Sequence, residues 1–193
     1  HYAINDIGVM RAFFGLDVIV PADANQTAYL TEALAKTDNP AYMRMGRSAV
    51  EDVYTEKDTF EIGKAKVLKE GKDIAVIACG KLVYQALKAA EELAKEGVNL
   101  TVIDMFTLKP LDEGAVLKAA ETGRVVTAEE HVRAGGLGEA VAALLCEKKP
   151  VKMKLLSLPD THIISGGDDA ILEYYGLSCD GIVKAARSLM EGI

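Results

Sequence analysis

The segment HYAINDIGVMRAFFGLDVIVPADANQTAYLTEALAKTDNPAYMRMGRS, residues 1–48, decides the fold of this chain. Its pattern predicts a helix from Tyr2 to about Phe13, a strand at Asp17–Ala22, a helix at Asn25–Lys36 and a second strand at Pro40–Gly46. Strand, helix and strand with short links form a parallel pair, and parallel sheets are covered by helices on both faces. Two strands do not supply that, and a piece of about 55 residues is marginal as an independent core. We therefore expect residues 1–48 to be the second half of a domain whose first half lies elsewhere.

The composition is typical of a soluble globular protein, because half of the 193 residues are hydrophobic and 26% are charged. No apolar run approaches the roughly 18 residues of a membrane span. The net charge of −7 argues against a nucleic-acid-binding surface. We expect no nucleic acid and no membrane as partners, and a cytoplasmic location. Cys79, Cys146 and Cys179 lie far apart in apolar runs, which favours reduced core cysteines over disulfides or a metal site.

Residues 49–59 are predicted to be a linker, because the apolar periodicity fades there and charges cluster. Residues 60–193 form the next domain. A half-exposed strand at Phe60–Leu68 turns into a buried strand at Asp73–Cys79, which predicts an antiparallel hairpin. Strands at Asn99–Asp104, Arg124–Ala128 and Val151–Ser157 then alternate with helices at Lys81–Lys95, Glu113–Glu121, Gly136–Lys148, near Asp168–Tyr175 and at Ser178–Met190. We expect an α/β domain with a five-stranded mixed sheet, of which four strands are parallel and one is antiparallel.

Glu129-Glu130-His131, followed by Gly135-Gly-Leu-Gly138, combines carboxylates and an imidazole at a strand end with a glycine turn before a helix. A helix N-terminus of this kind can hold an anion. However, the glycines lack the Gly-x-Gly-x-x-Gly spacing, and neither a lysine nor a nucleophile accompanies the polar residues. The preferred interpretation is an interdomain or subunit contact, with a ligand or regulatory site as the alternative.

Two further patterns predict how helices begin. Asp23 and Gln26 have the spacing of a capping box. Gly166-Gly-Asp-Asp169 is interpreted as a turn in which an aspartate caps the next helix.

Several motifs taken together resemble transketolase, and more closely the C-terminal half of transketolases that are split into two polypeptides. They cover almost the whole chain in the family's order: His1–Arg11, Val18–Asp23, Pro40–Arg47, Gly63–Asp73, Met105–Asp112 and Glu129–Gly138. The resemblance implies a transferase of carbohydrate metabolism, in the pentose phosphate pathway, that moves a two-carbon ketol unit between sugar phosphates using thiamine diphosphate. It also implies that residues 1–48 are the second half of the pyrimidine-binding domain and that residues 60–193 are the transketolase C-terminal domain.

The resemblance further implies that this chain needs a partner. The family's cofactor-activating glutamate and aromatic pocket precede the position of His1, while the diphosphate and its Mg (or Ca) ion belong to an N-terminal section. No cofactor-binding or metal-binding residue is therefore expected in this chain. We expect it to be inactive alone, and to work with the N-terminal section or subunit in a homodimer or heterotetramer.

Two residues match substrate-side positions of the family. His1 matches a histidine close to the reacting sugar hydroxyls, which gives it a catalytic and substrate-binding role, and Arg47 matches the arginine that contacts the substrate phosphate. The chemistry agrees, since an imidazole exchanges protons near neutral pH and a guanidinium is a charged, planar fork suited to phosphate. The plain alternatives are a frayed terminal histidine and a solvated arginine. Arg44 points to the opposite face of a regular strand and is interpreted as a structural or interface charge.

Three other functions stay open. Deoxyxylulose-5-phosphate synthase shares this C-terminal arrangement, although the pair Gly46-Arg47 and the segment Asp6–Arg11 fit transketolase better. The pyruvate-dehydrogenase-type beta subunit fits less well. The last alternative is a non-catalytic dimerisation or regulatory module.

Overall fold

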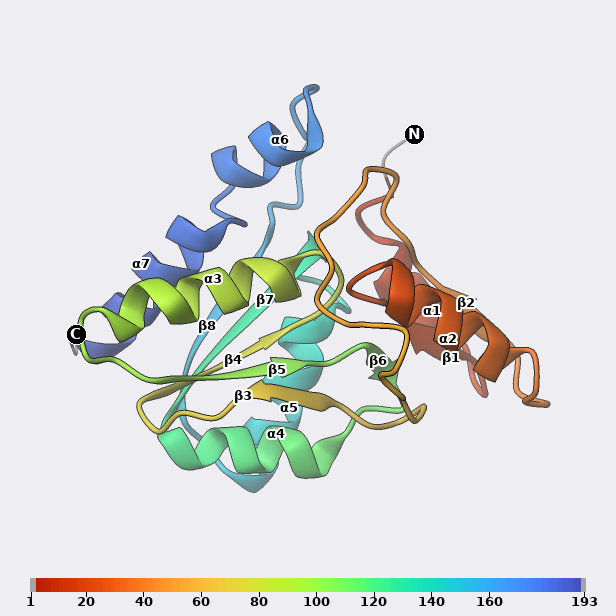
Figure 1. The fold of residues 1–193 in the computed structure, drawn as a ribbon, viewed down its shortest axis with the longest axis horizontal. Coiled ribbons are helices and arrows are strands. Elements are labelled where there is room, and N and C mark those ends of the chain that lie inside the picture. The colour runs from red at the N-terminus through yellow and green to blue at the C-terminus, as the bar shows by residue number, and fades with distance from the viewer. Residues whose placement is uncertain (1–2, 192–193) are drawn as a thin grey trace.

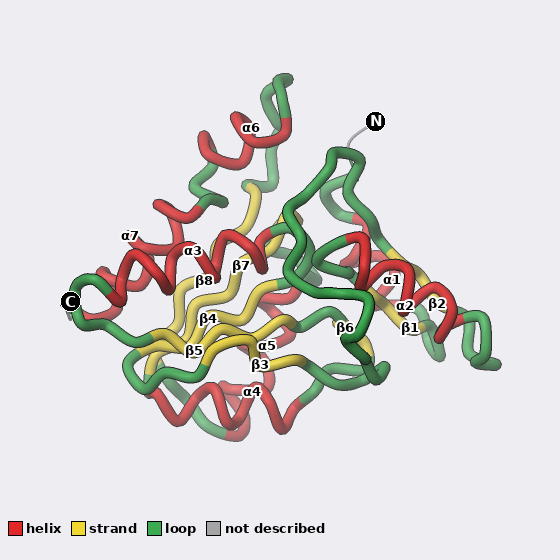
Figure 2. Tube along the Cα trace, in the orientation of Figure 1, coloured by secondary structure: helices red, strands yellow, loops and turns green. Residues whose placement is uncertain are grey.

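The computed structural model describes residues 3–191 and shows a mixed α/β architecture with two sheets (Figures 1 and 2). The N-terminal part contains α1 (Asp6–Ala12), β1 (Asp17–Ile19), α2 (Ala24–Leu34) and β2 (Ala41–Met43). The remainder contains β3 (Lys66–Lys69), β4 (Ile74–Ala78), α3 (Leu82–Ala94), β5 (Leu100–Asp104), β6 (Thr107–Lys109), α4 (Glu113–Ala119), the 3-10 helix Ala120–Thr122, β7 (Arg124–Val132), α5 (Leu137–Lys148), β8 (Lys152–Leu158), α6 (Asp168–Tyr174) and α7 (Cys179–Met190).

The larger sheet has the strand order β3-β5-β4-β7-β8, with β3 antiparallel and the other four strands parallel. Helices α3 and α7 lie on one face and α4 and α5 on the other (Figure 1). Strand β4 shows why both faces need cover. Ile74 and Val76 pack into the core beneath α3 and α7, whereas Ala75 and Ile77 pack into the core beneath α4 and α5. The continuous apolar run of this strand is the signature of burial on both faces, and the predicted five-stranded mixed sheet is confirmed.

The predicted hairpin is wrong. The antiparallel strand β3 pairs with β5, not with the following strand β4. After β3 the chain crosses the start of β5, where Gly71 N donates to Thr101 Oγ1 at 3.0 Å and Thr101 Oγ1 donates to Gly71 O at 2.6 Å. A Cβ on Gly71 would lie 2.4 Å from the carbonyl carbon of Leu100, so only glycine fits this crossing. The crossing places β4 on the far side of β5, between two parallel neighbours.

The smaller sheet has the order β2-β1-β6 and joins segments that are far apart in the sequence. Strand β1 pairs with β2 in parallel, as expected, with Val18 opposite Tyr42. Its other edge pairs antiparallel with β6, with Val18 opposite Lys109. Sequence reasoning missed β6, because three residues are too few for a periodic signal. The N-terminal segment is therefore connected to the rest of the chain by main-chain hydrogen bonds.

The cysteines do not all lie in the core. Cys79 is buried after β4 and Cys179 is partly buried, but Cys146 is exposed on α5. The expectation of three core cysteines is wrong for Cys146, because an apolar run in a helix also includes positions on its solvent side. Within residues 3–191, no helix is both long enough and apolar enough to cross a membrane.

Candidate functional site

The two predicted site residues differ in what the structure says of them. His1 lies outside the described residues. Arg47 is exposed in the loop after β2, at the carboxyl end of the β1–β2 pair. Its neighbours Gly46 and Ser48 line a cavity of about 430 Å³. Arg47 thus borders a cavity at strand ends, where open α/β sheets bind ligands, and its role stays a prediction.

The cavity lies where strand ends from both sheets meet. Its wall contains residues 20–24 after β1, part of the loop 44–50 after β2, and residues 79–81 after β4. Gly80 N donates to Val20 O at 3.2 Å, and Val20 N donates to Phe106 O at 2.7 Å. Gly80 adopts a φ of +58°, a conformation that glycine reaches without strain. These contacts make one cavity out of residues from both halves of the chain.

The start of α2 at this cavity is closed by its own side chains. Asp23 Oδ1 accepts from Gln26 N at 2.8 Å, while Oδ2 accepts from Val53 N and Tyr54 N, both at 2.7 Å. Gln26 Oε1 accepts from Ala22 N, one residue before the helix cap, so only the aspartate half of the predicted capping box is present. Because a carboxylate already occupies the helix start, an anionic ligand in the cavity needs arginine or lysine side chains.

A buried polar cluster lies behind the cavity. Tyr54 Oη and Gln26 Nε2 both donate to Asp104 Oδ2 at 2.7 Å, and Asp104 is fully buried. Its Oδ1 has no hydrogen-bond partner among the described residues. Burial raises the pKa of Asp104 to about 7, against the opposing effect of the two hydrogen bonds, and burial likewise raises the pKa of Tyr54. Sequence reasoning missed this cluster, since its members come from α2, the predicted linker and β5.

Five polar side chains form a chain of contacts around the rim of the cavity, which we call the rim network. Arg44 Nη1 lies 3.2 Å from Glu130 Oε2, and Glu130 Oε1 lies 3.4 Å from Lys81 Nζ. Lys81 Nζ lies 3.3 Å from Asp168 Oδ2, which also accepts from Ser48 Oγ at 2.7 Å. The network therefore links the loop after β2 with β7, with the turn before α3 and with the start of α6.

The rim network corrects two expectations about single residues. Strand β2 ends at Met43, so Arg44 and Arg47 both lie in the loop, and the alternation of strand faces does not separate them. The interpretation of Arg44 as a structural charge agrees with its ion pairs to Glu130 and, at 3.6 Å, to Asp6. Asp168 does not cap α6, because Gly167 occupies that position and makes no side-chain cap. Its carboxylate instead binds Ser48 and Lys81, which lie far away in the sequence.

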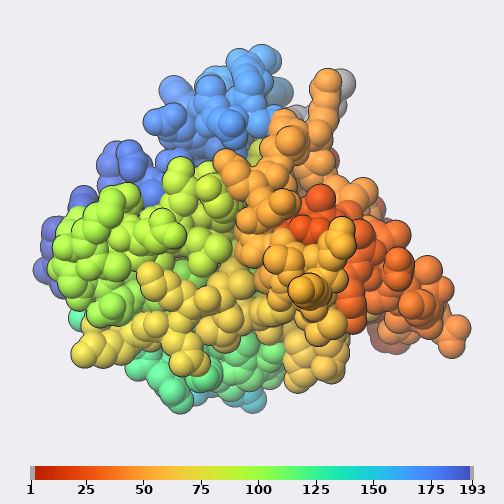
Figure 3. Space-filling view, in the orientation of Figure 1, coloured from red at the N-terminus to blue at the C-terminus, as the bar shows by residue number. Residues whose placement is uncertain are grey.

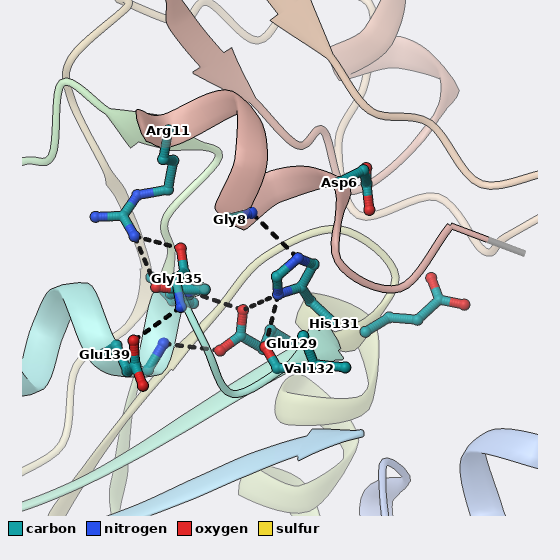
Figure 4. A network of polar contacts seen from close by, with 12 residues as sticks. Asp6, Gly8, Arg11, Glu129, His131, Val132, Gly135 and Glu139 are labelled. Carbon is teal, nitrogen blue, oxygen red and sulfur yellow. Dashed lines mark hydrogen bonds and ion pairs between the residues drawn. The ribbon is translucent and has the colours of Figure 1, made fainter. Parts of the chain in front are cut away.

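Glu129, Glu130 and His131 lie inside β7, which runs four residues beyond the predicted end at Ala128. Figure 4 shows His131 directed at the first turn of α1, where Gly8 N donates to His131 Nε2 at 3.2 Å. His131 Nδ1, 2.6 Å from Val132 O, therefore carries the proton, and burial lowers the pKa of His131. Arg11 donates to the carbonyls of Gly135 and Gly136. His131 and the glycine turn therefore contact the N-terminal segment, in line with the preferred interpretation of an interdomain or subunit contact.

Glu129 explains why no ligand is needed at the glycine turn. Its carboxylate accepts from Leu137 N at 2.7 Å and Gly138 N at 2.8 Å, so the protein's own side chain occupies the N-terminus of α5 (Figure 4). Burial raises the pKa of Glu129 to about 7, although these two N–H groups oppose the rise. A Cβ on Gly136 would lie 2.2 Å from Glu129 Oε2, which leaves no room for an added anion at this position. The alternative of a ligand site at the turn loses its support.

The sequence also matches known proteins. A family model described as "Transketolase, C-terminal domain" matches residues 63–182. One subunit of the apulose-4-phosphate transketolase of Phocaeicola vulgatus is 43% identical over 194 residues, which cover 99% of this chain and 62% of that protein. The 1-deoxy-D-xylulose-5-phosphate synthase of Desulfotalea psychrophila is 34% identical over 199 residues, which cover 99% of this chain and 31% of that protein.

A solved structure described as "Split gene transketolase, inactive beta4 tetramer" matches with a TM-score of 0.92 and 40% identity, and the match covers 99% of this chain and 62% of that one. This chain thus spans about three fifths of the length of the subunit-type relatives. Because the family model matches more than half of the residues, the chain belongs to the transketolase C-terminal domain family.

Proposed function

We propose that this chain is the C-terminal portion of a transketolase that transfers a two-carbon ketol group between sugar phosphates once an N-terminal portion completes it. The supporting observation is the cavity of about 430 Å³ at the ends of β1 and β4, bordered by the loop that carries Arg47. The printed names of the relatives, one a transketolase subunit and the other a split gene transketolase, support the same proposal.

The proposal includes a division into domains. Residues 1–48 are the second half of the pyrimidine-binding domain, residues 49–59 are a linker, and residues 60–193 are the C-terminal domain. The start of the family match at residue 63 supports this boundary. Strand β6 belongs to the C-terminal domain but pairs with β1 of the N-terminal part. We therefore propose that the two parts move as one unit.

In the proposed reaction, Arg47 binds the phosphate of the sugar and His1 hydrogen-bonds to the hydroxyls at the reacting carbon. A guanidinium binds two phosphate oxygens at once and keeps its charge at every working pH. The closed start of α2 supports this role for Arg47, because the helix end itself offers nothing to a phosphate.

Thiamine diphosphate supplies, when bound, the stabilised carbanion that ketol transfer needs. Within residues 3–191, no group of three or more His, Cys, Asp or Glu residues is placed to hold a metal ion. No described residue is assigned to the cofactor. We propose that the N-terminal partner and segments outside this chain bind it.

Apolar side chains exposed near α1 support a partner. Phe14 is fully exposed, and more than half of the surface of Phe13 and of Val9 is accessible. Large apolar groups gathered at one place on a surface mark interaction sites. We propose a homodimer or a heterotetramer with the N-terminal subunit.

The test is reconstitution with the N-terminal portion, thiamine diphosphate and Mg²⁺. We expect ketol transfer from xylulose 5-phosphate to an aldose phosphate, and no activity of either portion alone. Condensation of pyruvate with glyceraldehyde 3-phosphate in place of transfer would identify a deoxyxylulose-5-phosphate synthase, the alternative favoured by the 34% identical relative. If the N-terminal portion binds this chain and the complex catalyses neither reaction, the result would support the alternative that this chain is a non-catalytic module.

A further inference from the structure

We propose that Asp168 is a positioning residue for Arg47: by binding Ser48, it holds the loop after β2 in the conformation in which Arg47 meets the substrate phosphate. The inference rests on the proposed function and deepens it. It assigns to α6, an element without a role in the family-based interpretation of this chain, the control of affinity for phosphorylated substrates.

The loop that carries Arg47 is held on both sides of this residue. Before it, Arg44 pairs with Glu130 and Asp6, and Arg44 Nη2 also donates to Ala3 O at 3.2 Å. After it, Ser48 Oγ donates to Asp168 Oδ2 at 2.7 Å. The loop is exposed from residue 45 to residue 49, so burial does not order it. Polar contacts at its two ends therefore contribute to its conformation.

Asp168 is well placed for this task. Figure 3 shows the region of α6, in blue, and the loop after β2, in orange, standing on two sides of a hollow. Lys81 extends between them and contacts Asp168 at 3.3 Å. The Ser48 hydroxyl, the Lys81 ammonium and the charge of Arg47 lower the pKa of Asp168, so its carboxylate is charged at neutral pH. Lys81 Nζ also lies 3.4 Å from Glu130 Oε1. The contact between Ser48 and Asp168 is thus connected through Lys81 to the buried end of β7.

The physical benefit is preorganisation. A long arginine side chain on a loose loop loses conformational freedom when it binds a phosphate, and a loop ordered beforehand reduces that loss. Asp168 itself does not bind the phosphate, because two anions repel each other. Removing Asp168 also removes this repulsion, but the lost ordering of the loop is the larger effect in this proposal, so binding of the phosphate group weakens and the reacting end of the sugar is unaffected.

The experiment uses the completed enzyme and two acceptors that differ only in phosphate, glyceraldehyde 3-phosphate and glyceraldehyde. For Asp168→Asn we expect KM for the phosphorylated acceptor to rise about three- to tenfold, with kcat and the KM for glyceraldehyde unchanged. The matched control is Asp169→Asn, which changes the exposed neighbouring aspartate. Asp168→Asn removes the charge that pairs with Lys81, although the amide oxygen of asparagine still accepts from Ser48. Ser48→Ala removes the hydrogen bond itself from the loop side. It should reproduce or exceed the effect, and it tests the proposal independently if Asp168→Asn does not fold.

The coupling to Arg47 is tested in a double-mutant cycle. In an Arg47→Ala background, Asp168→Asn should have no further effect on the KM ratio of the two acceptors. If Asp168→Asn behaves like Asp169→Asn, or lowers kcat equally for both acceptors, the positioning role is refuted while the proposed function stands. If Arg47→Ala itself leaves the KM ratio unchanged, the proposed phosphate contact is refuted, and the role of Asp168 falls with it.

Discussion

Replacing Asp104 with asparagine should change how the stability of this protein depends on pH. Asparagine has the shape of aspartate, and its amide oxygen keeps the hydrogen bonds that Tyr54 and Gln26 donate to Oδ2. The amide nitrogen takes the place of Oδ1, which has no partner among the described residues in the native protein either. The substitution therefore removes the ionisation of the side chain and leaves its packing and its two hydrogen bonds intact.

The sign follows from the raised pKa. In the folded protein burial raises the pKa of Asp104 to about 7, against 3.8 for the unfolded chain. The folded state thus holds the proton more tightly, so this group's contribution to stability is complete below pH 3.8 and is lost as the pH rises to about 7. A difference of about three pH units corresponds to about 4 kcal/mol, of which about 3 kcal/mol is lost between pH 5 and pH 8.

Urea denaturation of the wild type and of Asp104→Asn at pH 5, 6, 7 and 8 measures this contribution. The variant should gain about 3 kcal/mol over the wild type from pH 5 to pH 8, and the gain should stop above pH 8. Asp38→Asn, which changes an exposed aspartate, should run parallel to the wild type. A constant difference between Asp104→Asn and the wild type at all four pH values would refute the reasoning.

Three further predictions concern the site and the contact with α1. Arg47→Ala in the completed enzyme should raise KM for phosphorylated substrates by at least ~10-fold, which corresponds to about 1.4 kcal/mol of lost phosphate contact. Steady-state kinetics measure this change, and an unchanged KM would show that Arg47 is not part of the site. His1→Ala should lower turnover or substrate affinity without changing cofactor affinity, as measured by kinetics and cofactor titration; a change in thiamine diphosphate affinity alone would contradict its placement. Gly8→Ala should destabilise the fold by about 1–3 kcal/mol in urea denaturation, because the new Cβ would lie 2.8 Å from Ala134 O. The control is Gly114→Ala in α4, which should be neutral or stabilising, since its new Cβ would meet only Asp112 Oδ1 at 3.4 Å. Equal effects of the two substitutions would contradict the close approach of α1 to the glycine turn after β7.

Much of the secondary structure was predictable because its signals are local. The apolar run 73–79 predicted a strand buried on both faces, and β4 is fully buried at each of its five positions. The predicted helices are all present with shifted ends, because helix ends depend on caps and on packing as well as on periodicity. Transketolase membership was also recognisable, since the motifs follow the family's order over the whole chain.

The candidate site was predictable only in part. Arg47 was predicted from its motif and from its position at a strand end, and its role stays a prediction. The predicted aspartate cap in Gly166–Asp169 was wrong, because the sequence shows the neighbours of Asp168 but not Ser48, which lies 120 residues away and donates to its carboxylate. Asp104 gave no signal, since one aspartate at the end of an apolar run resembles an ordinary strand end.

The amino-acid sequence by itself determined the alternation of strands and helices, the parallel core and the family, because these depend on the spacing of neighbouring side chains. The tertiary structure alone decided that β3 pairs with β5, that β6 joins the N-terminal sheet and that Asp168 meets Ser48. The physical reason is the same in each case. An edge strand or a surface carboxylate satisfies its hydrogen bonds equally well with many partners, and only the packed fold determines which partner is within reach.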